Sequence, residues 1–96
     1  MIVIEGTIRV ADMARAKSAM AAMVKASRAE AGCIDYAYAE DIFEPGLVRV
    51  IERWTNEAAF EAHLKSEHLR VWRESWAALG VANRDLRLYE AEPISI

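Results

Sequence analysis

Residues 33–54 read CIDYAYAEDIFEPGLVRVIERW, two β-rich runs separated by Glu44-Pro45-Gly46. β-branched and aromatic residues are typical of strands, and Pro and Gly at the centre are typical of a turn. This stretch therefore predicts a hairpin of two antiparallel strands. Because a slip of one residue turns every side chain to the opposite face, the pattern leaves open which tyrosines share a face with Glu52.

A strand and a helix are predicted before this hairpin. Residues 1–10 alternate with period two, and their apolar side consists of Ile2, Ile4, Ile8 and Val10. Asp12 can cap a helix, which we expect to close at Gly32, where a positive φ is readily adopted. Its apolar positions Met13, Ala16, Met20 and Met23 step by three and four residues, with Val24 on the same side.

A helical segment and a last strand are predicted after the hairpin. Thr55 or Asn56 can cap a short helix that turns Phe60 and Leu64 inward. After Ser66 a second helical stretch stops at Gly80, and we interpret the two as one interrupted segment. Its inward positions are Leu69, Trp72, Trp76 and Leu79. The last strand alternates Leu86, Leu88 and Glu90 against Arg87, Tyr89 and Ala91, and ends at Pro93.

The order β-α-β-β-α-β predicts an α+β, ferredoxin-like domain over residues 1–96. Right-handed crossovers place both helices on one face of a four-stranded antiparallel sheet. The other face is too apolar for a plain solvent surface and too charged for a core, and we expect a homodimer whose two sheets pack there, with Glu5 near arginines of the face. A sheet that stays wet is the alternative. The candidate residues of this face are Val3, Thr7, Arg49, Ile51, Arg53, Arg87 and Tyr89.

Charge and composition argue against several functions. The net charge of −3 is spread along the chain, so we expect no nucleic-acid partner. No apolar run approaches the roughly 20 residues that span a bilayer, and residues 1–5 lack the pattern of a signal peptide, so we expect no membrane association and a cytoplasmic location. Cys33 is the only cysteine; we interpret it as a small residue opening a strand, with a reactive thiol as the alternative.

Cofactor motifs are absent from the sequence. Four isolated glycines form no phosphate-binding loop, so nothing predicts a nucleotide or flavin. His63 and His68 lie five residues apart on or near one helix, a spacing that should point them in different directions. We therefore expect neither a cofactor nor a metal site.

An aromatic and histidine cluster around the second helical segment is the main candidate site. Such walls suit a flat aromatic ligand, although Phe60, Trp72 and Trp76 also fall on the inward stripe and can be core residues. Its members are Trp54, Phe60, His63, His68, Trp72 and Trp76, with Tyr36 and Tyr38 from the sheet. His63 borders the inward face, where it could transfer a proton.

Glu52 shares a strand face with Val48, Val50 and Trp54, where an unpaired carboxylate is costly. A histidine, a tyrosine hydroxyl or a ligand could pair with it. Exposure at the end of the sheet is the alternative.

Three stretches in this order and spacing resemble the antibiotic biosynthesis monooxygenase domain family, including its quinol monooxygenase branch. They are EAGCIDY at residues 30–36, ERW at 52–54 and AFEAHLKSEH at 59–68. The resemblance extends over nearly the whole chain. It implies a dimeric α+β barrel in which each subunit oxygenates phenolic, quinol or polyketide-like substrates without metal or flavin.

The resemblance also implies a set of site residues. Trp54 and His63 would line the pocket, with Glu52 and Tyr36 as further members. If the chain is an oxygenase, we hypothesise that the aromatic substrate itself reduces O₂, that His63 assists its deprotonation, and that Trp54 and Trp72 hold the ring. Phe60 and His68 complete the predicted substrate-binding set.

Two other functions remain open at this stage. One is a non-catalytic dimeric module that binds a small aromatic molecule. The other is a haem-degrading branch of the same fold, which the chain resembles less because an asparagine expected on the first strand is missing and Thr7 offers no substitute.

Overall fold

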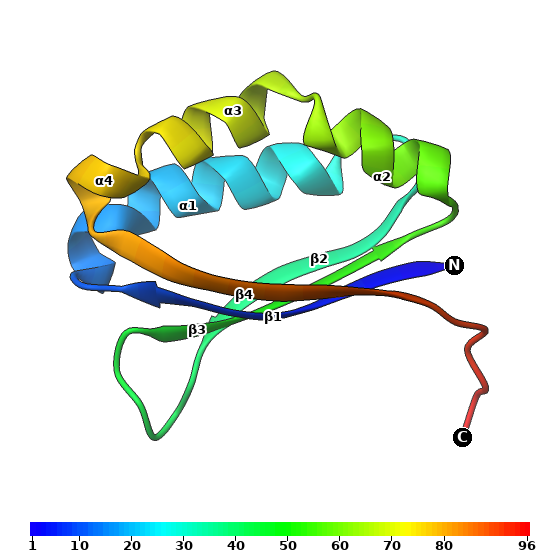
Figure 1. The fold of residues 1–96 in the computed structure, drawn as a ribbon, viewed down its shortest axis with the longest axis horizontal. Coiled ribbons are helices and arrows are strands. Elements are labelled where there is room, and N and C mark those ends of the chain that lie inside the picture. The colour runs from blue at the N-terminus through cyan, green and yellow to red at the C-terminus, as the bar shows by residue number, and fades with distance from the viewer.

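The structure is a computed structural model that describes residues 1–96. Four strands form one antiparallel sheet in the order β2-β3-β1-β4, and all helices lie on one of its faces (Figure 1). The predicted ferredoxin-like α+β fold is confirmed. In chain order the elements are β1 (Ile2–Val10), α1 (Met13–Arg28), β2 (Cys33–Glu40), β3 (Leu47–Trp54), α2 (Glu57–Leu64), α3 (Glu67–Glu74), α4 (Trp76–Leu79) and β4 (Val81–Glu90).

Helix α1 begins as predicted but ends earlier. The Asp12 carboxylate accepts a hydrogen bond from the Arg15 backbone N–H at 3.2 Å. The helix ends at Arg28, and Gly32, with φ +81°, lies in the turn that leads into β2. A Cβ at Gly32 would lie 2.6 Å from the Ala59 Cβ. The positive φ in this turn and the close packing against α2, and not closure of α1, therefore require this glycine.

The second helical segment is interrupted, as predicted, and consists of α2, α3 and α4. Asn56 caps α2 by accepting the Ala59 backbone N–H at 2.9 Å, and Gly80 ends α4 with φ +69°. Leu64 borders a cavity but is 44% exposed, so it is only partly inward, whereas His63 is 1% exposed. Phe60 and His63, three residues apart, are the pair that faces the sheet. Polar partners below α2 make the buried position suitable for a histidine.

The hairpin register, which the sequence left open, places both tyrosines on the helix side. Tyr36 pairs with Glu52, and Tyr38 pairs with Val50. An irregularity between Cys33 and Asp35 disturbs the alternation at the start of β2. Cys33 is partly buried there, and burial, followed by the nearby carboxylates, raises the pKa of its thiol.

Strand β4 begins at Val81, before the alternation that predicted it. The register shifts between Thr7 and Arg9, and Asn83 in the same region has φ +54°. Beyond this irregularity Leu86 and Leu88 lie opposite Gly6 and Ile4 on the helix side.

The bare face of the sheet has the composition that the sequence predicted. Val3 pairs with Arg53 and Tyr89, and Glu5 pairs with Ile51 and Arg87. No helix covers this side (Figure 1). None of the helices combines the length and apolar character needed to cross a membrane.

Gly6 allows β4 to approach β1 closely, and this contact provides a test of the fold. A Cβ at Gly6, where φ is +155°, would lie 1.9 Å from the Asp85 carbonyl oxygen. We expect Gly6→Ala to lower the free energy of unfolding by about 3 kcal/mol, because backbone has to move. Urea unfolding measures this. Ser18→Ala, on the exposed side of α1, is the control and should change it by less than about 0.5 kcal/mol; equal effects would contradict the close approach.

Candidate functional site

A cavity of about 240 Å³ lies between the sheet and helices α2 to α4. Eleven of its sixteen lining residues are hydrophobic, so its wall is mainly apolar. The volume falls just below the roughly 300–1,000 Å³ of drug-sized ligand pockets and suits a molecule of one or two rings. The sheet contributes Ile4, Ile8 and Tyr36, and the helices contribute Phe60, Leu69 and Trp72.

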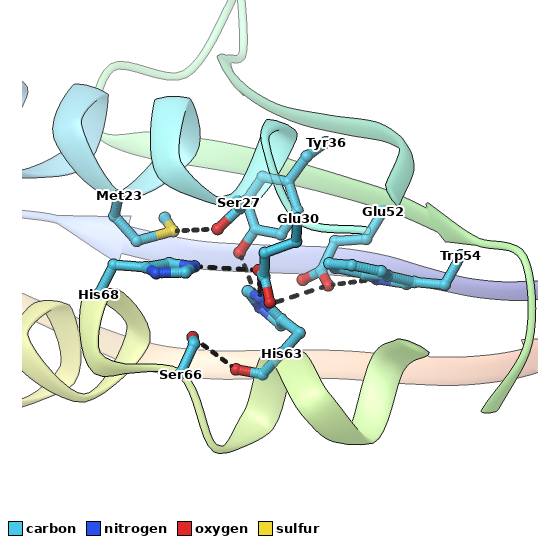
Figure 2. A network of polar contacts seen from close by, with 9 residues as sticks. All are labelled: Met23, Ser27, Glu30, Tyr36, Glu52, Trp54, His63, Ser66 and His68. Carbon is cyan, nitrogen blue, oxygen red and sulfur yellow. Dashed lines mark hydrogen bonds and ion pairs between the residues drawn. The ribbon is translucent and has the colours of Figure 1, made fainter. Parts of the chain in front are cut away.

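His63 lies in the last turn of α2 and joins three elements. Its Nδ1 is 2.6 Å from Glu30 Oε2, in the loop between α1 and β2 (Figure 2). Its Nε2 faces the sheet, 3.4 Å from the Tyr36 hydroxyl and 3.8 Å from Glu52 Oε1. Because a carboxylate only accepts, Nδ1 carries the proton and donates to Glu30.

The electrostatics of His63 favour an unprotonated Nε2. Burial lowers the pKa of His63, and the hydrogen bond and charge of Glu30 offset this only in part. The ring is thus neutral at pH 7, with Nδ1 protonated and Nε2 holding a lone pair. That lone pair belongs to a lining residue of the cavity, so the arrangement can accept a proton from a bound molecule.

His68 meets the same carboxylate, which contradicts the expectation that the two histidines point apart. His68 Nε2 is 2.9 Å from Glu30 Oε2 (Figure 2). The helix is interrupted between α2 and α3. In this interruption the Ser66 hydroxyl donates a hydrogen bond to the His63 carbonyl at 2.7 Å. The spacing argument assumed one continuous helix, whereas the break gives α3 a new axis and turns His68 back towards Glu30.

These three residues are also the group that could hold a metal ion. One ligand atom from each of Glu30, His63 and His68 lies within 4.8 Å of the others. The contacts of 2.6 and 2.9 Å to Glu30 Oε2 are hydrogen-bond distances. Two ligands of a tetrahedral zinc ion lie about 3.3 Å apart. In this arrangement Glu30 accounts for both ring N–H groups, and a cation would require the side chains to separate slightly.

Glu52 is buried on β3, 4% exposed, and its partner is one that the sequence analysis did not consider. The Trp54 indole N–H donates to Glu52 Oε1 at 3.0 Å. Residues two apart on a strand share a face, which brings the pair together. Burial raises the pKa of Glu52 to about 7, although the Trp54 hydrogen bond and the Arg73 charge act in the opposite direction. Glu52 therefore exchanges its proton near neutral pH.

The structure places most of the predicted site residues around the cavity. The lining ones are Tyr36, Glu52, Phe60, His63 and Trp72. Trp54 and His68 contribute nothing to this wall: Trp54 is fully buried beside Glu52, and His68 lies beyond Glu30 (Figure 2).

Sequence reasoning missed Glu30, Arg73 and Arg84. Glu30 lies in an irregular loop, where no periodicity indicates a direction, and only its position in the family-like stretch pointed to it. Arg73 follows the inward Trp72 and borders the cavity, while Arg84 follows the irregular start of β4.

Comparisons with known proteins agree with this fold. A sequence model of the family described as Antibiotic biosynthesis monooxygenase matches residues 1–75. The solved structure of a candidate antibiotic biosynthesis monooxygenase from Deinococcus radiodurans is 27% identical, with a TM-score of 0.87, covering 100% of this chain and 98% of that one. SnoaB, a cofactor-independent oxygenase from Streptomyces nogalater, is 15% identical with a TM-score of 0.82, covering 97% of this chain and 94% of its own, a likeness of fold alone.

A curated relative was found in Synechocystis. The uncharacterized protein sll1783 is 28% identical over 67 residues, which make up 70% of this chain. The match spans 46% of that relative's length, so the relative is about twice as long as the matched unit.

The raised pKa of Glu52 makes the stability of the protein depend on pH. Between pH 4.5, the ordinary pKa, and about 7, the folded state holds a proton that the unfolded chain releases. The contribution of Glu52 to stability therefore falls as pH rises through this window, by about 3 kcal/mol in total. In Glu52→Gln the amide oxygen can still accept the Trp54 N–H but cannot ionise.

Urea unfolding at pH 4.5 to 8 tests this difference. We expect wild type to lose stability relative to Glu52→Gln between pH 4.5 and 7, and the difference to level off above pH 8. Parallel pH profiles for the two proteins would show that Glu52 titrates normally in the folded state.

Proposed function

Because this chain belongs to the antibiotic biosynthesis monooxygenase family, we propose that it is a cofactor-independent monooxygenase with a small aromatic quinol, phenol or polyketide-like substrate. Within the family we place it with the quinol monooxygenase-like branch. The observation that carries the proposal is the position of His63 at the wall of an apolar, aromatic cavity, with its Nδ1 2.6 Å from the Glu30 carboxylate.

The reaction balances without an external reductant when the substrate is a 1,4-quinol. Quinol and O₂ give a hydroxyquinone and water: one oxygen atom enters the ring, and the other leaves as water. The four electrons that reduce O₂ come from the quinol itself, two through its oxidation to quinone and two through hydroxylation of a ring carbon. The protein then has to remove a proton, hold the ring and keep bulk water out.

His63 is the residue that we propose as the base. The substrate hydroxyl gives its proton to Nε2, and the resulting anion is the electron donor to O₂. Glu30 accepts a hydrogen bond from the Nδ1–H group, with 2.6 Å between Nδ1 and Oε2, so it fixes the tautomer and stabilises the charged ring that forms. Glu52, with its Oε1 3.8 Å from Nε2 and a pKa near 7, can pass the proton on.

The aromatic residues divide into a binding group and a positioning group. Tyr36, Phe60 and Trp72 line the cavity, and we assign them to holding the substrate ring. Trp54 and His68 lie outside the wall, so we assign them to positioning Glu52 and Glu30 through the hydrogen bonds at 3.0 and 2.9 Å.

The two alternatives differ in what the cavity supports. A dimeric module that binds a small aromatic molecule would use the same walls without a base. The haem-degrading alternative is disfavoured, because about 240 Å³ is too small for a macrocycle of that size.

We also propose that the protein is a homodimer formed through the bare face of the sheet. Val3 and Ile51 on this face are only partly buried, and Glu5, Arg53 and Arg87 place charges of both signs among them. Two-fold packing would remove the apolar groups from water and let opposite charges meet. The hairpin tip adds Ile42 and Phe43, 90% and 89% exposed, as further contact surface.

His63→Gln tests the base. We expect it to lower kcat for quinol oxidation about 10²- to 10⁴-fold, the usual contribution of a positioned base, with oxygen uptake on a panel of quinols as the measurement. His68→Gln is the matched comparison: His68 acts only through Glu30 and lies outside the cavity, so kcat of this variant should fall less than tenfold. Unchanged turnover in His63→Gln would remove this residue from the mechanism.

Two further measurements separate the alternatives. Protein treated with a chelator should retain its turnover; loss of activity that Zn²⁺ restores would instead make Glu30, His63 and His68 metal ligands. Quinol binding without oxygen uptake in wild type would favour the binding module.

Sedimentation tests the dimer. We expect wild type to sediment as a dimer at micromolar concentration, and Ile51→Glu to sediment as a monomer because it buries an unpaired charge in the interface. Val71→Glu makes the same change on α3, at a side chain that is 52% exposed on the helix side, and should leave the dimer intact. A monomeric wild type would contradict the proposal.

A further inference from the structure

Two indole N–H groups in the cavity wall have no hydrogen-bond partner. Nε1 of Trp72 and Nε1 of Trp76 are both inaccessible to solvent and unpaired. The Trp72 N–H lies near the Tyr38 hydroxyl and lowers its pKa, although the pair falls outside good hydrogen-bond geometry. An unpaired buried donor costs roughly 1–3 kcal/mol, and a molecule in the cavity that reached these groups by a small movement of the rings would supply the missing acceptor.

Two arginines line the same cavity without an acidic partner. Neither Arg73 on α3 nor Arg84 on β4 forms an ion pair. Arg70, three residues before Arg73 on the same helix, binds both Glu67 and Glu74. Arg73 is an exposed residue at the border of the cavity, and its charge also lowers the pKa values of Glu52 and His63. Its position and its lack of a partner leave it available to an anion in the cavity.

These donors lie towards the end of the cavity away from His63. The rings form a series from His63 to Tyr36, Tyr38, Trp72 and Trp76, with successive centroids 5.2, 5.8, 6.3 and 6.0 Å apart. Helix α2 carries His63 and helix α4 carries Trp76, and the two helices lie at opposite ends of the helical layer (Figure 1). The cavity therefore has an acid–base end at His63 and a donor end at Trp76.

Every polar group named at the donor end donates hydrogen bonds, and two carry a positive charge. The complementary ligand group is anionic and has several acceptor oxygens. A carboxylate fits best, since it accepts two parallel N–H bonds from a guanidinium and leaves lone pairs for an indole. We propose that the site selects aromatic acids: the oxidisable hydroxyl lies at His63, and the carboxylate binds Trp76, Arg73 and Arg84.

This inference rests on the proposed function for the direction of the substrate, but binding of the carboxylate needs no turnover. The test therefore uses (2,5-dihydroxyphenyl)acetate and its methyl ester, which differ in charge and share the quinol ring. Binding is measured without oxygen, by calorimetry and by tryptophan fluorescence. Wild type should bind the acid at least about tenfold more tightly than the ester, and raising the salt concentration should weaken only the acid.

Matched variants locate the carboxylate. Arg73→Met should reduce the acid-to-ester preference about tenfold or abolish it, and Arg84→Met should reduce it. Arg70→Met, on the same helix but paired with Glu67 and Glu74, should leave the preference unchanged. His63→Gln should also keep it, because His63 lies at the other end of the cavity.

The indole protons give a second readout. Trp76→Phe keeps an aromatic ring and removes the donor, and it should lower the preference. In the NMR spectrum of wild type the Trp76 indole N–H resonance should shift with the acid and not with the ester. Equal binding of acid and ester, or equal behaviour of the Arg73 and Arg70 variants, would overturn the inference. Absence of oxygen uptake with intact acid selectivity would overturn only the proposed oxygenase.

Discussion

The hydrogen bond between Glu30 and His63 is the constraint on which the site depends. A histidine that is 1% exposed needs a partner for its N–H, and Glu30 supplies one from a loop far away in the sequence. The bond fixes the tautomer, turns the unprotonated Nε2 towards Tyr36 and Glu52, and connects the end of α1 to α2. His68 adds a second donor to the same oxygen from the start of α3. One carboxylate thus holds two helices over the sheet and fixes the tautomer of His63.

Periodic elements could be predicted from the sequence, and the elements without a period could not. The alternation around Ile4 and Ile8 and the stripe through Met20 determine β1 and α1, because burial of one face selects a single register. His68 was placed wrongly because the prediction extended a regular helix beyond Leu64, where α2 ends. Leu64 lies before this interruption; there the buried position is three residues after Phe60, not four. An interruption of a helix changes the direction of the helix that follows it, and the spacing of residues in the sequence does not predict that direction.

The candidate site shows the same limit. His63 could be proposed from its place beside the apolar stripe, and Glu52 from its cost on an apolar strand. Their partners could not be predicted, since Glu30 lies in a loop and the Trp54 indole depends on a rotamer. Which tyrosine meets His63 depends on the hairpin register, and the irregularity at Cys33 shows that even a clear hairpin pattern does not determine that register alone.

The cavity wall contains buried donors that lower the stability of the free protein and that the fold does not require. An apolar wall could be closed with phenylalanine at positions 72 and 76, whereas the chain places there two indoles whose N–H groups have no partner. Burial of donors without acceptors destabilises the free protein, and this cost is recovered only when something brings acceptors. At the other end Glu52 and His63 already have partners, although burial shifts both pKa values towards the neutral forms. The two ends therefore differ in kind: one is complete and can exchange a proton, and the other is completed by a ligand.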